Sequence, residues 1–300
     1  MSVDDSSKTV EAADPFHPRA VVWVDETRFR VDDVEFEHSF EKGSSACPLY
    51  IRKQRPLIEA TVELLQRQRF DNIVELGIAQ GGSTALLAMV ADPRKLVAVE
   101  LSEDRIPALD EFIAQRCLTD VVRPWFGVDQ GDRGRLASIV GDEFGGEALD
   151  LVIDDASHSY EETRASFETL FPFLRPDGVY VIEDWAWQLH YQYLVSAVSG
   201  LDAAHLEEAA ANSAHDEERA KSGRPAGQGW SKRLRPIPLE TLILQLVLAR
   251  ACSGDVVHDL AIGKHWVEVR RGPAVLDPRS FRIVDSYLDI SGILGDRRTR

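Results

Sequence analysis

Short runs of apolar, largely β-branched residues alternate with segments of helical periodicity through the middle of the chain. Runs that are apolar at nearly every position indicate strands buried on both faces, which is typical of a parallel sheet. The five strands predicted in this way are Asn72–Leu76, Leu96–Val99, Val121–Phe126, Leu149–Ile153 and Val179–Ile182. The predicted helices are Leu57–Leu65, Thr84–Val90, Asp104–Gln115, Asp132–Val140 and Tyr160–Leu174. Strands and crossover helices in this order predict an α/β, Rossmann-like doubly wound sheet.

The last part of the pattern differs from the rest. A helical run at Leu239–Ala251 is followed by two strand-like runs, Val256–Ala261 and His265–Arg270, which are joined at Gly263–Lys264. A short glycine-containing connection between two such runs indicates a β-hairpin. The complete prediction is therefore a seven-stranded sheet with an antiparallel C-terminal hairpin.

Flanking segments suggest a division of the chain. Residues 1–50 begin with a polar, acidic stretch and continue with partial apolar alternation over Val21–Glu37, so they are predicted to form an N-terminal arm or lid. Residues 51–275 are predicted to form the main domain. An Ala-, Glu- and Gly-rich stretch suggests a lid insertion at about 195–238, and residues 276–300 are expected to be a C-terminal tail.

Composition narrows the class of partner. The chain has 50 acidic and 34 basic residues and a formal charge of −16, so phosphate backbones and anionic lipids are poor partners. We therefore expect no nucleic acid and no membrane partner. Cys47, Cys117 and Cys252 form no CxxC pair, and there is no signal-peptide pattern. These observations favour a cytoplasmic protein.

A glycine-rich turn follows the first predicted strand of the main domain. It reads Glu75-Leu76-Gly77-Ile78-Ala79-Gln80-Gly81-Gly82-Ser83-Thr84. The dinucleotide fingerprint requires glycine at Ala79, and a phosphate-binding loop requires lysine after Gly82, so neither pattern fits. With Glu75 two residues before Gly77, the segment resembles motif I of the class I methyltransferases. That resemblance implies a cofactor contact at Glu75, Gly77, Gly81, Gly82 and Ser83; an ordinary tight turn is the alternative.

Two further segments suggest a nucleoside site. Glu100 closes the second strand, where an acid binds ribose hydroxyls in related folds. Asp129 and Gln130 follow the third strand, and the resemblance to class I methyltransferases implies that this segment lies by the adenine, where either residue could bind its amino group. The alternatives are a solvated acid at Glu100 and a helix N-cap at Asp132.

Acidic pairs end the next two strands. Asp154-Asp155 follows the fourth strand and Glu183-Asp184 ends the fifth. The carboxyl ends of parallel strands share one edge of the sheet, and carboxylates gathered there repel one another unless a cation is present. Oxygen ligands favour Mg²⁺, Mn²⁺ or Ca²⁺, so we predict Asp155, Glu183 and Asp184 as metal ligands. Helix caps and loop contacts are the alternative. His158, three residues after Asp155, is a candidate general base.

The segments Asp154-Asp155-Ala156-Ser157-His158, Ser166–Pro172 and Val181–Trp185 resemble the metal-dependent sugar O-methyltransferases of the macrocin and mycinamicin type. Segment Glu75–Ser83 is similar to the related cephalosporin hydroxylase-like family. The resemblance covers about residues 70–190. It implies that Asp155, Glu183 and Asp184 hold Mg²⁺, that Asp155 and His158 are catalytic, and that Asp154 belongs to the cofactor side.

The predicted function is S-adenosylmethionine- and Mg²⁺-dependent O-methylation of a hydroxyl on a sugar or glycosylated small molecule. Trp185, Trp187, His190 and Tyr191 could form an aromatic wall for a sugar ring, with ordinary packing as the alternative. A catechol acceptor, an NAD-dependent oxidoreductase and a non-enzymatic binding module remain as rivals. The oxidoreductase gives the strand-end acids no role. A homo-oligomer is compatible with this resemblance.

Overall fold

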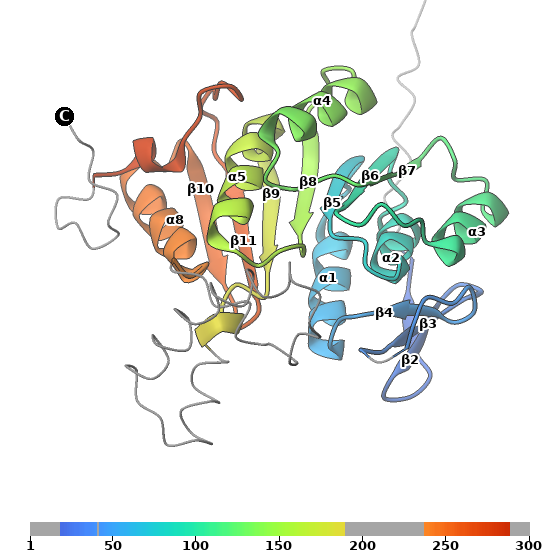
Figure 1. The fold of residues 1–300 in the computed structure, drawn as a ribbon. Coiled ribbons are helices and arrows are strands. Elements are labelled where there is room, and N and C mark those ends of the chain that lie inside the picture. Colours follow the sequence, from blue (N-terminus) through green and yellow to red (C-terminus); the bar gives the residue numbers. More distant parts are fainter. Residues whose placement is uncertain (1–18, 41, 190–236, 289–300) are drawn as a thin grey trace, which may run out of the picture.

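The computed structural model describes residues 19–40, 42–189 and 237–288 (Figure 1). Its main feature is a seven-stranded sheet in the order β10-β11-β9-β8-β5-β6-β7. The strands are β5 (Asn72–Leu76), β6 (Lys95–Glu100), β7 (Val122–Phe126), β8 (Leu149–Asp154), β9 (Leu174–Glu183), β10 (Val257–Ile262) and β11 (Trp266–Arg271). Strands β5 to β9 pair in parallel, whereas β11 pairs antiparallel with both β9 and β10. The predicted fold class is confirmed.

Helices cover both faces of this sheet. They are α1 (Arg55–Arg67), α2 (Gly82–Ala91), α3 (Pro107–Gln115), α4 (Arg133–Phe144), α5 (Tyr160–Leu170) and α8 (Glu240–Cys252), with 3₁₀ turns at Phe171–Phe173 and Ile283–Ser286. Because side chains alternate along a strand, Ile73, Ile153 and Val181 pack against the layer of α1, α2 and α3. Their neighbours Val74, Val152 and Ile182 pack against α4, α5 and α8.

The boundaries of several elements differ from the prediction, and one helix and one strand show the physical reasons. The helix predicted over Tyr160–Leu174 ends at Leu170, because Pro172 lacks the amide proton that would continue the helix. Strand β9 begins at Leu174 instead of Val179 and includes Pro176 and Gly178, which sequence propensity disfavours in strands. The pairing of β8 with β9 is accordingly irregular between Leu149 and Leu151.

A second, four-stranded sheet precedes α1. It consists of β1 (Val21–Trp23), β2 (Arg28–Val31), β3 (Val34–His38) and β4 (Leu49–Ile51), in that order. The partial apolar alternation over Val21–Glu37 corresponds to its first three strands, which pair antiparallel, and β4 adds a parallel partner to β3. Phe29 and Phe36 stack with ring centroids 5.1 Å apart and belong to the same core as α1 and α2. The division of the chain into arm, domain and tail stays a prediction, and the proposed lid lies almost entirely outside the described residues.

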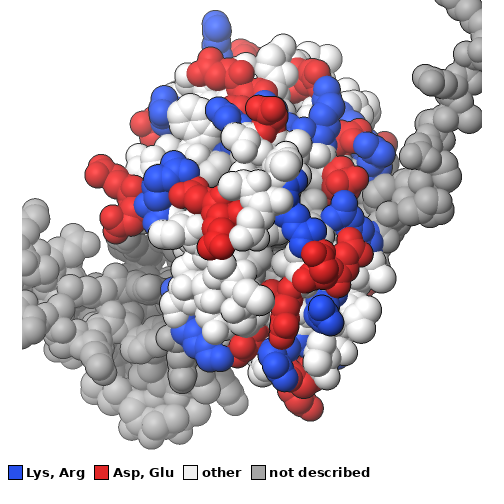
Figure 2. Space-filling view, turned by 90° about the vertical axis from the view of Figure 1, so that its right-hand side faces the viewer, with Lys and Arg blue, Asp and Glu red and all other residues white. Residues whose placement is uncertain are grey.

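Charges of both signs are interspersed on the molecular face in Figure 2, which is the side that carries α3 and β7 in Figure 1. Ion pairs such as Arg116–Asp33 at 2.7 Å and Arg105–Asp110 at 2.5 Å tie neighbouring elements together. In the part of the chain that the structure describes, no helix has both the length and the apolar composition that crossing a bilayer requires.

A close backbone contact places α2 against the small sheet. A Cβ atom at Gly82 would lie 2.2 Å from the carbonyl oxygen of Tyr50, so only glycine fits there without a shift of the backbone. We therefore expect Gly82→Ala to lower the free energy of unfolding by about 2 kcal/mol or more in urea titrations. Gly141→Ala is the matched control, because its Cβ meets no atom within 4 Å in helix α4, and it should stabilise the protein by about 0.5 kcal/mol. Equal midpoints for the two variants would contradict this account.

Candidate active site

The predicted acids lie at one edge of the sheet, where the parallel strands end. Glu183 is the last residue of β9, Glu100 is the last residue of β6, and Asp155 directly follows β8. The amide of Asp155 donates to the carbonyl of Leu76 at 2.9 Å, which keeps the ends of β8 and β5 together beyond the ladder. The edge predicted from the sequence is therefore formed by neighbouring strands.

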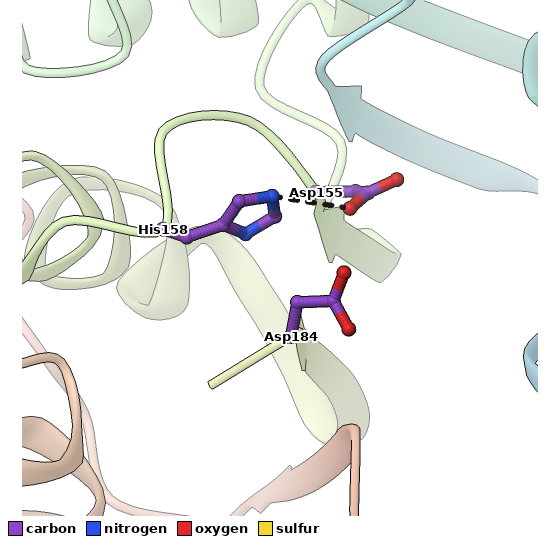
Figure 3. A group of neighbouring side chains, drawn as sticks. All are labelled: Asp155, His158 and Asp184. Atoms are coloured by element: carbon purple, nitrogen blue, oxygen red, sulfur yellow. Dashed lines mark ion pairs between the residues drawn. The ribbon is translucent and has the colours of Figure 1, made fainter. Parts of the chain in front are cut away.

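Asp155, His158 and Asp184 form a compact group at this edge (Figure 3). One ligand atom from each of the three lies within 4.8 Å of the others, and His158 Nε2 is 3.7 Å from Asp155 Oδ1. All three side chains are partly exposed. The structure thus brings together two of the three predicted metal ligands and the predicted base.

The loops that carry this group hold it in strained conformations. His158 has φ 53° and Asp184 has φ 47°, which are left-handed values that non-glycine residues seldom adopt. Trp187 Nε1 donates to the carbonyl of His158 at 2.9 Å, and the Asp184 amide donates to the carbonyl of His265 at 2.8 Å. Such strain persists only where surrounding contacts enforce it, and it is common at functional sites.

Glu183, the third predicted ligand, is placed differently. Its side chain is fully buried on the α1 side of the sheet, and its Oε2 accepts a hydrogen bond from Lys53 Nζ at 2.5 Å. The same Nζ donates to Asp155 Oδ2 at 2.5 Å. Lys53 was not predicted, yet its ammonium group links two of the three acids assigned to the metal.

Strand alternation explains why Lys53, which lies between β4 and α1, contacts these acids. Glu75 in β5, Glu183 in β9 and Asp155 directly after β8 are odd-numbered, and they face the α1 layer as Ile73, Ile153 and Val181 do. Lys53 precedes the first turn of α1, where the helix dipole is unfavourable to a cation. That unusual location, together with the strand parity, is a signal from which the pairing could have been found.

The charges in this buried group shift one another's ionisation. Burial acts to lower the pKa of Lys53, but attraction to Asp155 and Glu183 outweighs it and raises that pKa above its ordinary value. Burial raises the pKa of Glu183, and the charge of Asp155 adds to the rise while Lys53 opposes it. Lys53 is therefore a permanent cation at neutral pH.

The glycine-rich turn is shaped by close backbone approaches. Gly77 has φ 92°, and a Cβ there would lie 2.4 Å from the carbonyl oxygen of Asp155. Gly81 has φ 88°, and its Cβ would lie 2.8 Å from Leu109 Cβ. A small pocket at the turn is lined by residues of the turn and of its neighbours, among them Gly77, Ala79, Gly82, Ser83, Lys53 and Asp155.

Glu100 lies beside this turn, as the nucleoside prediction requires. Its Oε2 accepts from the amides of Ile78 and Ala79 at 3.0 Å each, and its Oε1 accepts from the Ser102 amide at 3.1 Å. A carboxylate can accept about four hydrogen bonds, so Glu100 can still accept one from a ribose hydroxyl. Asp129 is exposed in the loop that follows β7, and its side chain accepts a hydrogen bond from the Gly131 amide at 2.7 Å.

Two other predicted cofactor residues, Gln130 and Asp154, are hydrogen-bonded to each other. Gln130 Nε2 donates to both oxygens of Asp154 at 3.1 and 3.2 Å, and its Oε1 accepts from the Ser157 amide at 2.7 Å. Asp154 is buried and also accepts from Ser166 at 2.8 Å and from Tyr180 at 2.9 Å. These contacts favour a structural role beneath the site, because a direct cofactor contact would require the network to open.

Glu75 is also buried, and it accepts a 2.6 Å hydrogen bond from Thr84 Oγ1.

Of the predicted aromatic wall, Trp185 donates to the Gly263 carbonyl at 2.8 Å and Trp187 supports His158. His190 and Tyr191 lie outside the described residues.

A larger pocket of about 700 Å³ adjoins the acidic group. It lies between α1 and the β10–β11 hairpin, and Lys53, Asp155 and Asp184 line it together with apolar residues such as Leu57 and Ile262. Arg67, at the end of α1, forms a two-point ion pair with Glu268 of β11 at 2.8 and 3.0 Å, so the two walls are joined. The volume suits a small molecule.

The donor set is compatible with a hard divalent cation. Asp155 and Asp184 offer carboxylate oxygens toward the pocket, and oxygen ligands of this kind suit Mg²⁺ or Mn²⁺. The buried Oε1 of Glu183 has no hydrogen-bond partner among the described residues, which leaves one further uncompensated oxygen atom close to these two carboxylates. The residues present therefore fit a metal of this class.

The strand order, the glycine-rich turn after β5 and the acids after β8 and β9 together define a Rossmann-like methyltransferase fold. Residues 74–185 match the family model described as a methyltransferase domain.

Curated relatives confirm the resemblance to macrocin- and mycinamicin-type enzymes. Demethylmacrocin O-methyltransferase of Streptomyces fradiae is 50% identical over 19% of this chain and 13% of its own length. Mycinamicin VI 2''-O-methyltransferase of Micromonospora griseorubida is 40% identical over 20% of this chain and 18% of its own length. The 8-demethyl-8-alpha-L-rhamnosyl tetracenomycin-C 2'-O-methyltransferase of Streptomyces olivaceus is 45% identical over 19% of this chain and 14% of its own length. The chain thus spans less than a fifth of the length of these relatives.

Among solved structures, the MycE methyltransferase in complex with Mg, SAH and mycinamycin VI is 20% identical and has a TM-score of 0.46. The match covers 72% of this chain and 49% of that chain. A putative caffeoyl-CoA O-methyltransferase from Staphylococcus aureus is 14% identical, with a TM-score of 0.47 and coverage of 74% and 86%.

Glu75 makes the stability of the fold depend on pH. Burial raises its pKa from 4.5 to about 7, so between these values the folded chain holds a proton that the unfolded chain releases. Stability contributed at this position is therefore lost as the pH rises from 4.5 to 7, by up to about 3 kcal/mol. We expect Glu75→Gln to gain that amount relative to the wild type between pH 5 and pH 8 in urea unfolding. Exposed Glu59→Gln is the control, and parallel curves for Glu75→Gln and the wild type would refute the assignment.

Proposed function

We propose that this chain is an S-adenosylmethionine-dependent O-methyltransferase that uses a divalent cation and methylates a hydroxyl of a sugar or glycosylated small molecule. The observation that carries the proposal is the group of Asp155, His158 and Asp184 beside the glycine-rich turn of a methyltransferase domain. The names of the curated relatives, one of which specifies a rhamnosyl compound, support a glycosylated acceptor.

The positions of the residues support the roles that we propose for them. The turn from Gly77 to Ser83, with Glu100 beside it, is placed to bind the methyl donor, whose sulfonium supplies the transferred methyl group. Asp155 and Asp184 are placed to hold a divalent cation, which when bound would act as a Lewis acid toward an acceptor hydroxyl. The pocket of about 700 Å³ is the space for that acceptor.

His158 is placed to take the proton from the acceptor hydroxyl. Its ring lies at the same group of carboxylates, and the neutral imidazole is an effective proton acceptor near pH 7. The Asp155 carboxylate, 3.7 Å away, stabilises the imidazolium that forms. Trp187 fixes the backbone that carries the ring.

Ligand binding separates this proposal from its rivals. Metal-stripped chain should bind S-adenosylhomocysteine with a micromolar Kd in isothermal titration and show no heat with NAD⁺, and transfer assays with added Mg²⁺ should favour macrolide glycosides over catechols. Binding of NAD⁺ alone would establish the oxidoreductase reading. Turnover only on catechols would establish the catechol reading, and cofactor binding without turnover on any acceptor would favour a binding module.

The proposed base gives a mutational prediction. His158→Ala should reduce kcat by about 10²–10⁴-fold, the usual contribution of general base catalysis, and should leave the Kd for S-adenosylhomocysteine unchanged. Exposed His258→Ala on the edge strand β10 is the matched control and should retain full activity. Full turnover by His158→Ala would remove histidine from the mechanism.

A further inference from the structure

The acidic edge of the sheet contains a cation that belongs to the protein. Lys53 is 6% exposed, and its Nζ lies 2.5 Å from Asp155 Oδ2 and 2.5 Å from Glu183 Oε2. Two short contacts to separate carboxylates, made by one buried ammonium, are far stronger than a surface ion pair, because water screens them little. The lysine is thus a fixed part of the site.

Some carboxylate oxygen atoms of the site contact Lys53, and the others do not. It occupies one oxygen of Asp155, and the other oxygen faces His158 at 3.7 Å. It also occupies Oε2 of Glu183, a side chain with no exposed surface. Asp184 has no contact with Lys53 among those that the structure records in its described part, and 42% of its side chain is exposed.

The lining of the pockets supports the same division. Lys53 and Asp155 line both the small pocket at the glycine-rich turn and the larger pocket beside it, and Asp184 lines the larger one. Glu183 lines neither of these pockets within the described ranges. A cation entering from solvent therefore meets Asp155 and Asp184 first and meets Lys53 before it can reach Glu183.

We propose that Lys53 is the resident cation of this site, that it retains Glu183 as its partner, and that it limits the affinity of Asp155 and Asp184 for a divalent ion. This inference rests on the proposed function only in treating the edge as a metal site. A single positive charge bound to the same carboxylate as a divalent ion repels that ion. Glu183, one of the three acids predicted as ligands, is on this account a partner of the lysine.

The test measures metal binding, without any need for turnover. Full-length, metal-stripped chain is titrated with Mn²⁺, with the free ion followed by electron paramagnetic resonance and Mg²⁺ used as competitor. Asp184→Asn should weaken Mn²⁺ binding by about tenfold or more, whereas Glu183→Gln should change the Kd by less than about threefold. Lys53→Met should tighten binding by about tenfold, because it frees an oxygen of Asp155 and removes a positive charge.

Lys95→Met is the matched control, since that lysine also pairs with a carboxylate, Glu143 at 3.2 Å, but at the opposite end of the sheet. Its Mn²⁺ affinity should equal that of the wild type. If Lys53→Met does not fold, the double variant Lys53→Met/Glu183→Gln removes one charge of each sign and takes its place. That double variant should still bind Mn²⁺ more tightly than the wild type.

A different pattern would overturn the inference. If Glu183→Gln weakens Mn²⁺ binding as much as Asp184→Asn does, and the lysine variants weaken it or leave it unchanged, then Lys53 is displaced by the metal or has a purely structural role. Absence of Mn²⁺ binding in the wild type and in every variant would also overturn it. Retained S-adenosylhomocysteine binding in that case would leave the methyltransferase assignment standing, so the two failures are distinguishable.

Discussion

Acidic groups gathered on the same side of a sheet impose the main constraint on this molecule. Glu75, Asp155 and Glu183 project from β5 and from the ends of β8 and β9 toward the α1 layer, where two of them are fully buried. Desolvation and mutual repulsion would make this arrangement costly without positive charge among them. Lys53 supplies that charge, and it reaches the site only because the segment before α1 passes directly over the strand ends.

This requirement connects the small N-terminal sheet to the active edge. Strand β4 ends at Ile51, two residues before Lys53, and α1 begins two residues after it. The Tyr50 carbonyl in β4 packs against the space that Gly82 leaves open at the start of α2. A shift of the small sheet would therefore move both the lysine and the glycine-rich turn. Strands β1 to β4 consequently contribute to the geometry of the site, although none of the acids comes from them.

The sequence predicted the parts of this structure that depend on local periodicity and on strand order. Alternation of apolar runs and helical segments was sufficient for the seven-stranded sheet, and parallel topology was sufficient to bring Asp155 and Asp184 to one edge. The pairing of Lys53 with Asp155 spans 102 residues, so apolar periodicity does not encode it, and the only signal for it is the unusual place of a lysine before α1 together with the strand parity. The bonds between Gln130 and Asp154 were missed for the same reason. The early start of β9 was missed because sheet pairing overrides the unfavourable propensities of Pro176 and Gly178.

The two pockets share a wall, and under the proposed function that wall would determine where methyl transfer occurs. Arg52, Lys53 and Asp155 line both the pocket at the glycine-rich turn and the larger pocket between α1 and the hairpin. A methyl donor bound at the turn and an acceptor bound in the larger pocket would meet only across these residues. Catalysis of methyl transfer depends mainly on holding the two reactants in line at short distance. Lys53 and Asp155 lie at this crossing point, and the ion pairs of Lys53 with Asp155 and Glu183 also join the ends of β8 and β9, so under the proposed function the same contacts would serve both stability and positioning.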